Sequence, residues 1–462
     1  MQTNESGIPK MTRKRRLAAN FSVGMYSKSL ILARQLAIVP LFISAWGPEY
    51  FGEWLLISSI PSFLAMSNLG VGTSAATRAV LALGAQNYRE ANSLCLTAIV
   101  FIALFGGPLL LAVASLALLG FQFPVSSFEL LGAPWPVFLI LLGSVFPTQL
   151  CAPLEAYWIH GQRAAASSMI LSTQVAVELV VTAAVVASGG MAFAVSIGIL
   201  FSKLSCLVLY AVLSFSMVNR GAGATVSFGV LSKLLVSGIG FQLSAVWQAI
   251  LFQGTLWVAA LTLGTTGAAK WGTLRTLCRT GNQVLTLVNQ SIAPELQNAI
   301  AKDEVGLARE LHSAGVMVSI VLSVPMAIAL SLFGPMVYEV WTKGMFSVPP
   351  FAWWLMSLSL VLHSFWWTSS VVHRASNRPW RINSLGVASA ACSAFCMYYL
   401  SMAFGVSGLA TGLVVFELIM AVFVLQSSLR ILGDTLQQFC CRCTGIASSA
   451  IRTSKLLSRG KS

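Results

Sequence analysis

Twelve stretches of this chain are apolar and long enough to cross a lipid bilayer as α-helices, and this limits the possible folds more than any other feature. A spanning helix needs about 20 consecutive, mostly apolar residues. Of the 462 residues, 56% are hydrophobic and only 9% are charged, which is typical of a polytopic membrane protein. The sequence therefore predicts an all-α fold with twelve transmembrane helices. The stretches are 20–46, 51–78, 92–119, 135–159, 166–188, 191–217, 231–262, 270–298, 312–333, 349–373, 380–403 and 406–432.

The basic residues predict which side of the membrane each connection faces. Basic residues such as Arg78, Arg163, Arg220 and Arg309 lie at or near the connections that follow even-numbered helices. The connections that follow odd-numbered helices contain few basic residues besides Lys343. Cytoplasmic connections are rich in Lys and Arg, so both ends of the chain are expected in the cytoplasm. The net charge of +14 is explained in this way, and no nucleic-acid partner is expected.

The two halves of the chain resemble each other at an offset of 217 residues. Gly47 then falls on Gly264, and Trp54 falls on Trp271. Two parallel repeats of six helices are a common plan for transporters. We therefore predict a basic cytoplasmic tail (1–19), a first six-helix bundle (20–217), a cytoplasmic linker (218–230), a second six-helix bundle (231–432) and a second basic cytoplasmic tail (433–462).

Cations inside the first predicted helix indicate a functional path. Lys28 and Arg34 lie within the run 20–46, where Asn20, Ser27 and Arg34 recur every seven residues on one polar face. A cation at the centre of a spanning helix costs roughly 2.5–3.5 kcal/mol, so it usually faces protein or a wet cavity. The alternative is that both side chains extend to a membrane surface.

A second polar stripe lies on the eighth predicted helix. Arg275, Arg279 and Asn282 step by four and three residues, which places them on one helical face. Gln248 occupies a similar polar face on the seventh helix. We predict that a central cationic cavity between the bundles binds an anionic substrate. Its predicted substrate-binding residues are Lys28, Arg34, Gln248, Arg275, Arg279 and Asn282.

Three further charges fall inside apolar runs. Glu178 and Lys203 lie at a shared predicted depth of roughly 15–18 Å, so they are expected to form an ion pair, with a structural role or a place in the transport path. Glu417 has no evident partner and is either a core residue or an ion-coupling site, a role for which Glu178 is a second candidate. No metal-ligand spacing or nucleotide-binding motif occurs, so no cofactor is expected.

Several short motifs resemble a known family, the polysaccharide transporter branch of the multidrug/oligosaccharidyl-lipid/polysaccharide flippase superfamily. They are Gly47-Pro-Glu-Tyr-Phe-Gly-Glu-Trp54, Asn68-Leu-Gly-Val-Gly72, Gly84-Ala-Gln-Asn-Tyr-Arg-Glu-Ala91 and Glu155-Ala-Tyr-Trp-Ile-His-Gly-Gln-Arg163. The family often has Asp where this chain has Asn68, so the role of that position is open.

The resemblance implies a substrate and a place of action. The substrate would be an undecaprenyl-diphosphate-linked oligosaccharide, moved to the outer leaflet of the bacterial inner membrane for O-antigen, capsule or exopolysaccharide assembly. Lys28, Arg34 and Arg275 or Arg279 look like the basic residues that line the cavity of the related lipid II flippase. Membrane lipids, a polysaccharide polymerase and chain-length machinery are the implied partners.

Two other functions, an antiporter and a membrane enzyme, make different demands on the sequence. A multidrug or cation antiporter of the same superfamily would favour an acidic cavity, whereas the predicted cavity is basic. A membrane-embedded polysaccharide polymerase or ligase would need a sizeable outer loop with catalytic groups. The longest outer connection, 121–134, holds one acidic residue and no base, so a transporter is expected rather than an enzyme.

Overall fold

The computed structural model describes residues 13–67, 70–121, 128, 130–218, 220–376 and 379–445, and all regular structure in these ranges is helical. Ten helical stretches of the described chain are long and apolar enough to span a membrane. Two of them, Ser22–Ala65 and Leu243–Ile300, are 44 and 58 residues long, so each contains two spans. The predicted all-α fold with twelve spans is therefore confirmed.

A glycine divides each of these two long stretches. In α1 (Arg13–Ser67), Gly47 has φ 77° and ψ 169°, and in α9 (Thr255–Ala301), Gly264 has φ 74° and ψ −177°. This backbone region is open essentially only to glycine, because a Cβ atom would clash with the neighbouring carbonyl group. The chain thus leaves one span and enters the next through an almost identical turn in each half.

The same offset relates further unusual positions in the backbone. Gln86 has φ 60° and Asp303 has φ 58°, each 217 residues from the other and each just before a long helix. Few residues other than glycine adopt positive φ, so two such pairs at one offset are not explained by shared composition alone. The internal repeat predicted from Gly47 and Gly264 is confirmed in the backbone.

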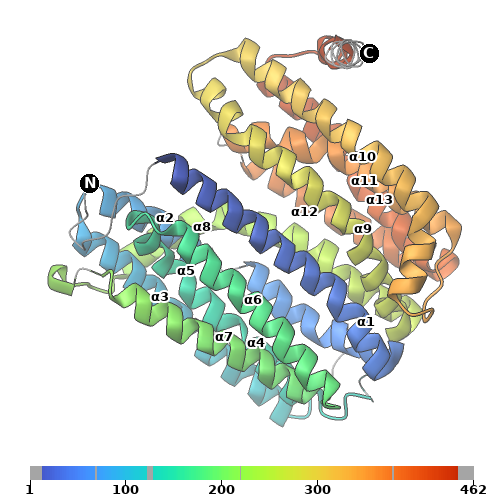
Figure 1. Ribbon diagram of the computed structural model, residues 1–462, viewed down its shortest axis with the longest axis horizontal. Helices are drawn as coiled ribbons and strands as arrows, with labels where there is room; N and C mark the ends of the chain where they lie inside the picture. Colours follow the sequence, from blue (N-terminus) through green and yellow to red (C-terminus); the bar gives the residue numbers. More distant parts are fainter. Residues whose placement is uncertain are drawn as a thin grey trace, which may run out of the picture. The chain divides into compact units, whose positions relative to one another are not determined.

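The chain forms two compact units, Met1–Gln242 and Leu243–Ser462. In the first unit α1 packs against α6, and α2 packs against α3 and α5 (Figure 1). Leu234, in the first half of α8, is fully buried in the core of this unit. Besides α1, its helices are α2 (Val71–Gly84), α3 (Tyr88–Leu118), α4 (Pro134–Gly143), α5 (Val145–His160), α6 (Ala164–Ala187), α7 (Ala192–Phe215), the 3-10 turn η1 (Arg220–Ala222) and the start of α8 (Phe228–Ala249).

The second unit is built around α11, which packs against α9, α10 and α13, while α12 packs against α13. Its core includes the aromatic side chains of Trp247, Trp366 and Phe416, with Trp247 stacked on Phe416. Its helices are the end of α8, the π-helix η2 (Ile250–Gly254), α9, α10 (Val305–Trp341), α11 (Pro350–Ala375), α12 (Pro379–Phe404) and α13 (Val406–Ile431).

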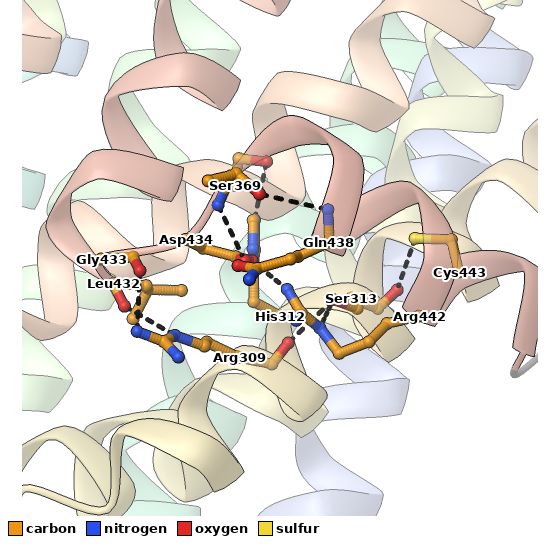
Figure 2. Close-up of polar contacts among 11 residues, drawn as sticks. Arg309, His312, Ser313, Ser369, Leu432, Gly433, Asp434, Gln438, Arg442 and Cys443 are labelled. Atoms are coloured by element: carbon orange, nitrogen blue, oxygen red, sulfur yellow. Dashed lines mark hydrogen bonds and ion pairs between the residues drawn. The ribbon is translucent and has the colours of Figure 1, made fainter.

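A further short helix, 436–445, follows α13 and packs against the second unit. Phe439 is buried there beside Leu429 and Val316. Arg442 forms an ion pair with the buried carboxylate of Asp434, two residues before this helix (Figure 2). The first part of the predicted C-terminal tail is therefore anchored on the helical bundle, and the tail beyond residue 445 lies outside the described residues.

Arg309 caps the C-terminal end of α13 (Figure 2). Its Nε donates to the carbonyl oxygen of Leu432 at 2.8 Å, and its Nη2 donates to that of Gly433 at 2.7 Å. The last carbonyl groups of a helix have no partner within the helix, so a cation at this place both bonds to them and complements the helix dipole.

Candidate functional site

Arg34 lies in an ion pair inside the first unit. Its Nη1 is 2.7 Å from Oε1 of Glu178 on α6, and Gln174 Nε2 donates to the other carboxylate oxygen at 2.8 Å. The Arg34 side chain is 36% exposed, whereas that of Glu178 is 9% exposed. One face of the guanidinium group therefore remains accessible while the carboxylate is held within the bundle.

The predicted ion pair between Glu178 and Lys203 is wrong. Lys203 Nζ donates instead to the hydroxyl of Ser144 at 3.4 Å. The prediction compared only how deep Glu178 and Lys203 lie along the fifth and sixth spans. In the structure α1 packs on α6, and the Arg34 guanidinium group occupies the place beside the carboxylate.

Lys28 lies on the same helix as Arg34, about 9 Å nearer its start at 1.5 Å per residue. It is half-buried, and its ammonium group has no hydrogen bond or ion pair within the described part of the chain. Asn20 and Asn68, two other positions raised by the sequence, lie outside the residues whose side chains are described.

Arg275 is buried and bonded within the second unit. Its Nη1 donates to the Leu251 carbonyl at 2.9 Å and to Thr255 Oγ1 at 2.7 Å. Leu251 belongs to the π-helix η2, where i→i+5 bonding shifts the backbone pattern away from that of an α-helix. The guanidinium group thus ties α9 back to the π-helix.

Arg279, one turn further along α9, has different surroundings. Its guanidinium carbon lies 3.6 Å from the centre of the Phe252 ring, a cation–π contact, and Phe252 is also part of the π-helix. The side chain is exposed, and it makes no hydrogen bond or ion pair in the described ranges. Arg279 is therefore an accessible cation without a counter-ion there.

The predicted polar residues beside these cations have mixed contacts. Asn282 Oδ1 is buried and lacks a hydrogen-bond partner among the described residues. Gln248 Nε2 donates to the Ser244 carbonyl of its own helix at 3.0 Å. The Asn282 amide oxygen can therefore still accept a hydrogen bond, whereas the Gln248 amide nitrogen already donates one locally.

Glu417 has partners that the sequence did not reveal. Trp366 Nε1 donates to its Oε2 at 2.5 Å, and His363 Nδ1 lies 3.2 Å from both carboxylate oxygens. All three side chains lie near the middle of α11 or α13. The sequence does contain a signal for this contact. In the predicted topology these two helices run in the same direction, so His363 and Glu417 fall at similar depths in the membrane.

The described residues include no group of three or more His, Cys, Asp or Glu side chains placed to hold a metal ion. The structure groups Arg34 with Glu178 in the first unit, and Arg275 with Arg279 around Phe252 in the second. A cavity shared by the two units stays a prediction.

Solved transporter structures share this architecture. An inward-facing multidrug resistance MATE family transporter of the MOP superfamily matches with a TM-score of 0.74 at 14% identity, over 90% of this chain and 98% of that one. An outward-facing transporter of that kind matches with a TM-score of 0.64 at 16% identity, over 90% and 94%. This chain has the fold of MOP-superfamily transporters.

A third structure is a MOP superfamily transporter from Pyrococcus furiosus, described as having a binding pocket of reverse polarity that suggests a different function. It matches with a TM-score of 0.64 at 17% identity, over 92% of this chain and 100% of that one. No protein-family model and no curated protein matches the sequence. The likeness therefore establishes the fold of a multi-pass membrane protein.

Proposed function

We propose that this protein is a flippase that moves an undecaprenyl-diphosphate-linked oligosaccharide across the bacterial inner membrane for O-antigen, capsule or exopolysaccharide biosynthesis. The transporter fold supports movement of a substrate by alternating access. In this proposal both termini are cytoplasmic, and the product passes to a polysaccharide polymerase and its chain-length machinery.

One observation carries the proposal: Arg279 presents an accessible guanidinium group on a membrane-spanning stretch without a carboxylate partner in the described chain. A cation inside a membrane protein is costly unless an anion or water compensates it. A diphosphate can supply that charge and can accept paired hydrogen bonds from Arg. Lys28 is a second such cation, on α1.

The remaining residues have supporting roles. Arg34 supplies a cation from the first unit, and Arg275 fixes the π-helix that carries Phe252 beneath Arg279. Asn282 and Gln248 offer amide groups to phosphate or sugar. The prenyl tail stays in lipid while the two units rock about the bound head group, so several modest contacts favour release better than one deep site.

Complementation of a bacterial strain that lacks its own flippase tests this function. Arg34→Ala and Arg279→Ala are expected to reduce surface glycan severely at unchanged protein levels, whereas Arg34→Lys keeps partial function because a point cation remains. Lys343→Ala, which removes an exposed cation from the connection after α10, is the matched control. Normal surface glycan in the double variant Arg34→Ala, Arg279→Ala would end the flippase proposal.

A multidrug or cation antiporter is the second candidate, favoured by the buried Glu417 carboxylate beside His363. Buried acids of this kind can bind a coupling ion, whereas Glu178 is already paired with Arg34. The antiporter predicts ethidium efflux from proteoliposomes under a proton or sodium gradient. Glu417→Gln would then abolish efflux, and Arg279→Ala would leave it intact.

A further inference from the structure

Charged side chains from three helices of the first unit, α1, α6 and α7, form one group. Glu178 on α6 receives a hydrogen bond from Gln174 one turn before it, and an ion pair from Arg34 on α1. Lys203 on α7 lies within the electrostatic influence of both Glu178 and Arg34, and it donates to Ser144 at the junction of α4 and α5. The group therefore contains two cations and one anion.

The charges in this group do not cancel. With two basic side chains and one carboxyl group, each in its usual charged form at neutral pH, the net charge is +1 within an apolar bundle. Within the described residues Lys203 donates one hydrogen bond, which at 3.4 Å is long for an ammonium group. An anion that enters the group would neutralise it.

The geometry also indicates which partner can move. Glu178 is nearly buried and held from two sides, whereas the Arg34 side chain is long and 36% exposed. A guanidinium group can leave one carboxylate and reach another anion by changes in its own torsion angles. If it leaves, Glu178 needs a new cation, because an unpaired buried carboxylate is strongly disfavoured. Lys203 lies on α7, which packs against α6, so it is the candidate to supply that cation.

We propose that Glu178 acts as an internal counter-anion that competes with a diphosphate for Arg34, and that Lys203 takes over the carboxylate when Arg34 binds the ligand. This inference rests on the proposed function, and it adds Lys203 and Glu178 to the substrate site. The competition lowers the affinity of Arg34 for the diphosphate, so the head group is bound without being trapped.

The test measures binding to the purified full-length protein in detergent, with farnesyl diphosphate and inorganic diphosphate as probes. Glu178→Gln frees Arg34 and is expected to tighten binding of both probes by about tenfold, the effect of roughly 1.4 kcal/mol. The further change Arg34→Ala should abolish that gain. Lys203→Met should weaken binding severalfold although Arg34 is intact, because Glu178 then has no second cation.

Matched variants separate this exchange from a purely structural ion pair. Glu155→Gln removes the same charge from a half-buried site on α5 of the same unit and should leave both affinities unchanged. A structural pair predicts a lower melting temperature for Glu178→Gln without tighter binding, and that result would overturn the inference. If Glu178→Gln does not fold, Glu178→Asp, which keeps the charge but shortens the reach to Arg34, should give an intermediate gain.

The inference and the proposed function can fail separately. Normal complementation together with equal affinities in wild type and Glu178→Gln would refute the exchange and leave the flippase standing. Failed complementation together with the tenfold gain for inorganic diphosphate would leave the exchange standing and refute the assigned substrate.

Discussion

Arg275 and Arg279 lie one turn apart on α9, yet their guanidinium groups do different things. Arg275 donates hydrogen bonds to Leu251 and Thr255, and Arg279 stacks on Phe252 without a hydrogen-bond partner in the described chain. Hydrogen bonds from a charged group to buried acceptors contribute about 1.5–3 kcal/mol, whereas an exposed cation–π contact contributes about 0.5–1 kcal/mol. The first arginine is thus mainly a stabilising residue and the second an accessible one.

Alanine substitutions should separate these two roles. Arg275→Ala is expected to destabilise the protein by about 2–3 kcal/mol, because the Leu251 carbonyl and the Thr255 hydroxyl lose a charged donor. Arg279→Ala should leave the melting temperature nearly unchanged while reducing diphosphate binding. Thermal melts in detergent, followed by intrinsic tryptophan fluorescence, measure the stability of both variants, and a titration with inorganic diphosphate measures the binding. Equal melting temperatures for the two variants would contradict this assignment.

At the scale of helices, the sequence predicts where the spans lie better than what their side chains contact. The twelve spans and the 217-residue repeat follow from apolar run lengths and from paired glycines, both of which are local features. The π-helix 250–254 has no such signal, because its residues are ordinary for a membrane helix. The partners of Glu178 and Glu417 depend on which helices pack together, and helix depth alone does not determine that.

The glycine turns give a sharp test at this scale. Gly47→Ala and Gly264→Ala should each destabilise the protein by about 1–3 kcal/mol, because alanine is strained at φ values of 77° and 74°. Apart from the adjacent residues of the chain, no atom lies within 4 Å of a Cβ added at either glycine, so the cost arises from the local backbone conformation and not from crowding by other helices. The melting temperature of each variant measures it.

Gly24→Ala is the matched control within α1. A Cβ there also meets no atom within 4 Å outside the nearby backbone of its own helix, but the residue lies in regular helix. Alanine should therefore be neutral or stabilising by up to about 1 kcal/mol. If Gly47→Ala behaved like Gly24→Ala, the strain attributed to the turn would be absent.

At the scale of the whole molecule, the two units are joined through one helix. Each unit has its own buried core, but α8 contributes Leu234 to the core of the first unit and continues past Gln242 into the second. The connection before α8 is irregular and is bonded to the first unit, where Thr225 N donates to Ser93 Oγ at 3.0 Å. Backbone continuity should therefore matter within α8 and much less just before it.

Split chains test this directly. Fragments 1–226 and 227–462, expressed together, are expected to assemble and to support the same activity as the intact chain, because the break falls in an exposed connection. Fragments 1–242 and 243–462 interrupt α8, and each new helix end leaves up to four backbone groups without helical partners. In lipid each such group costs several kcal/mol, so this second pair should neither co-purify nor function. Equal recovery of both pairs would show that α8 does not join the units as one continuous helix.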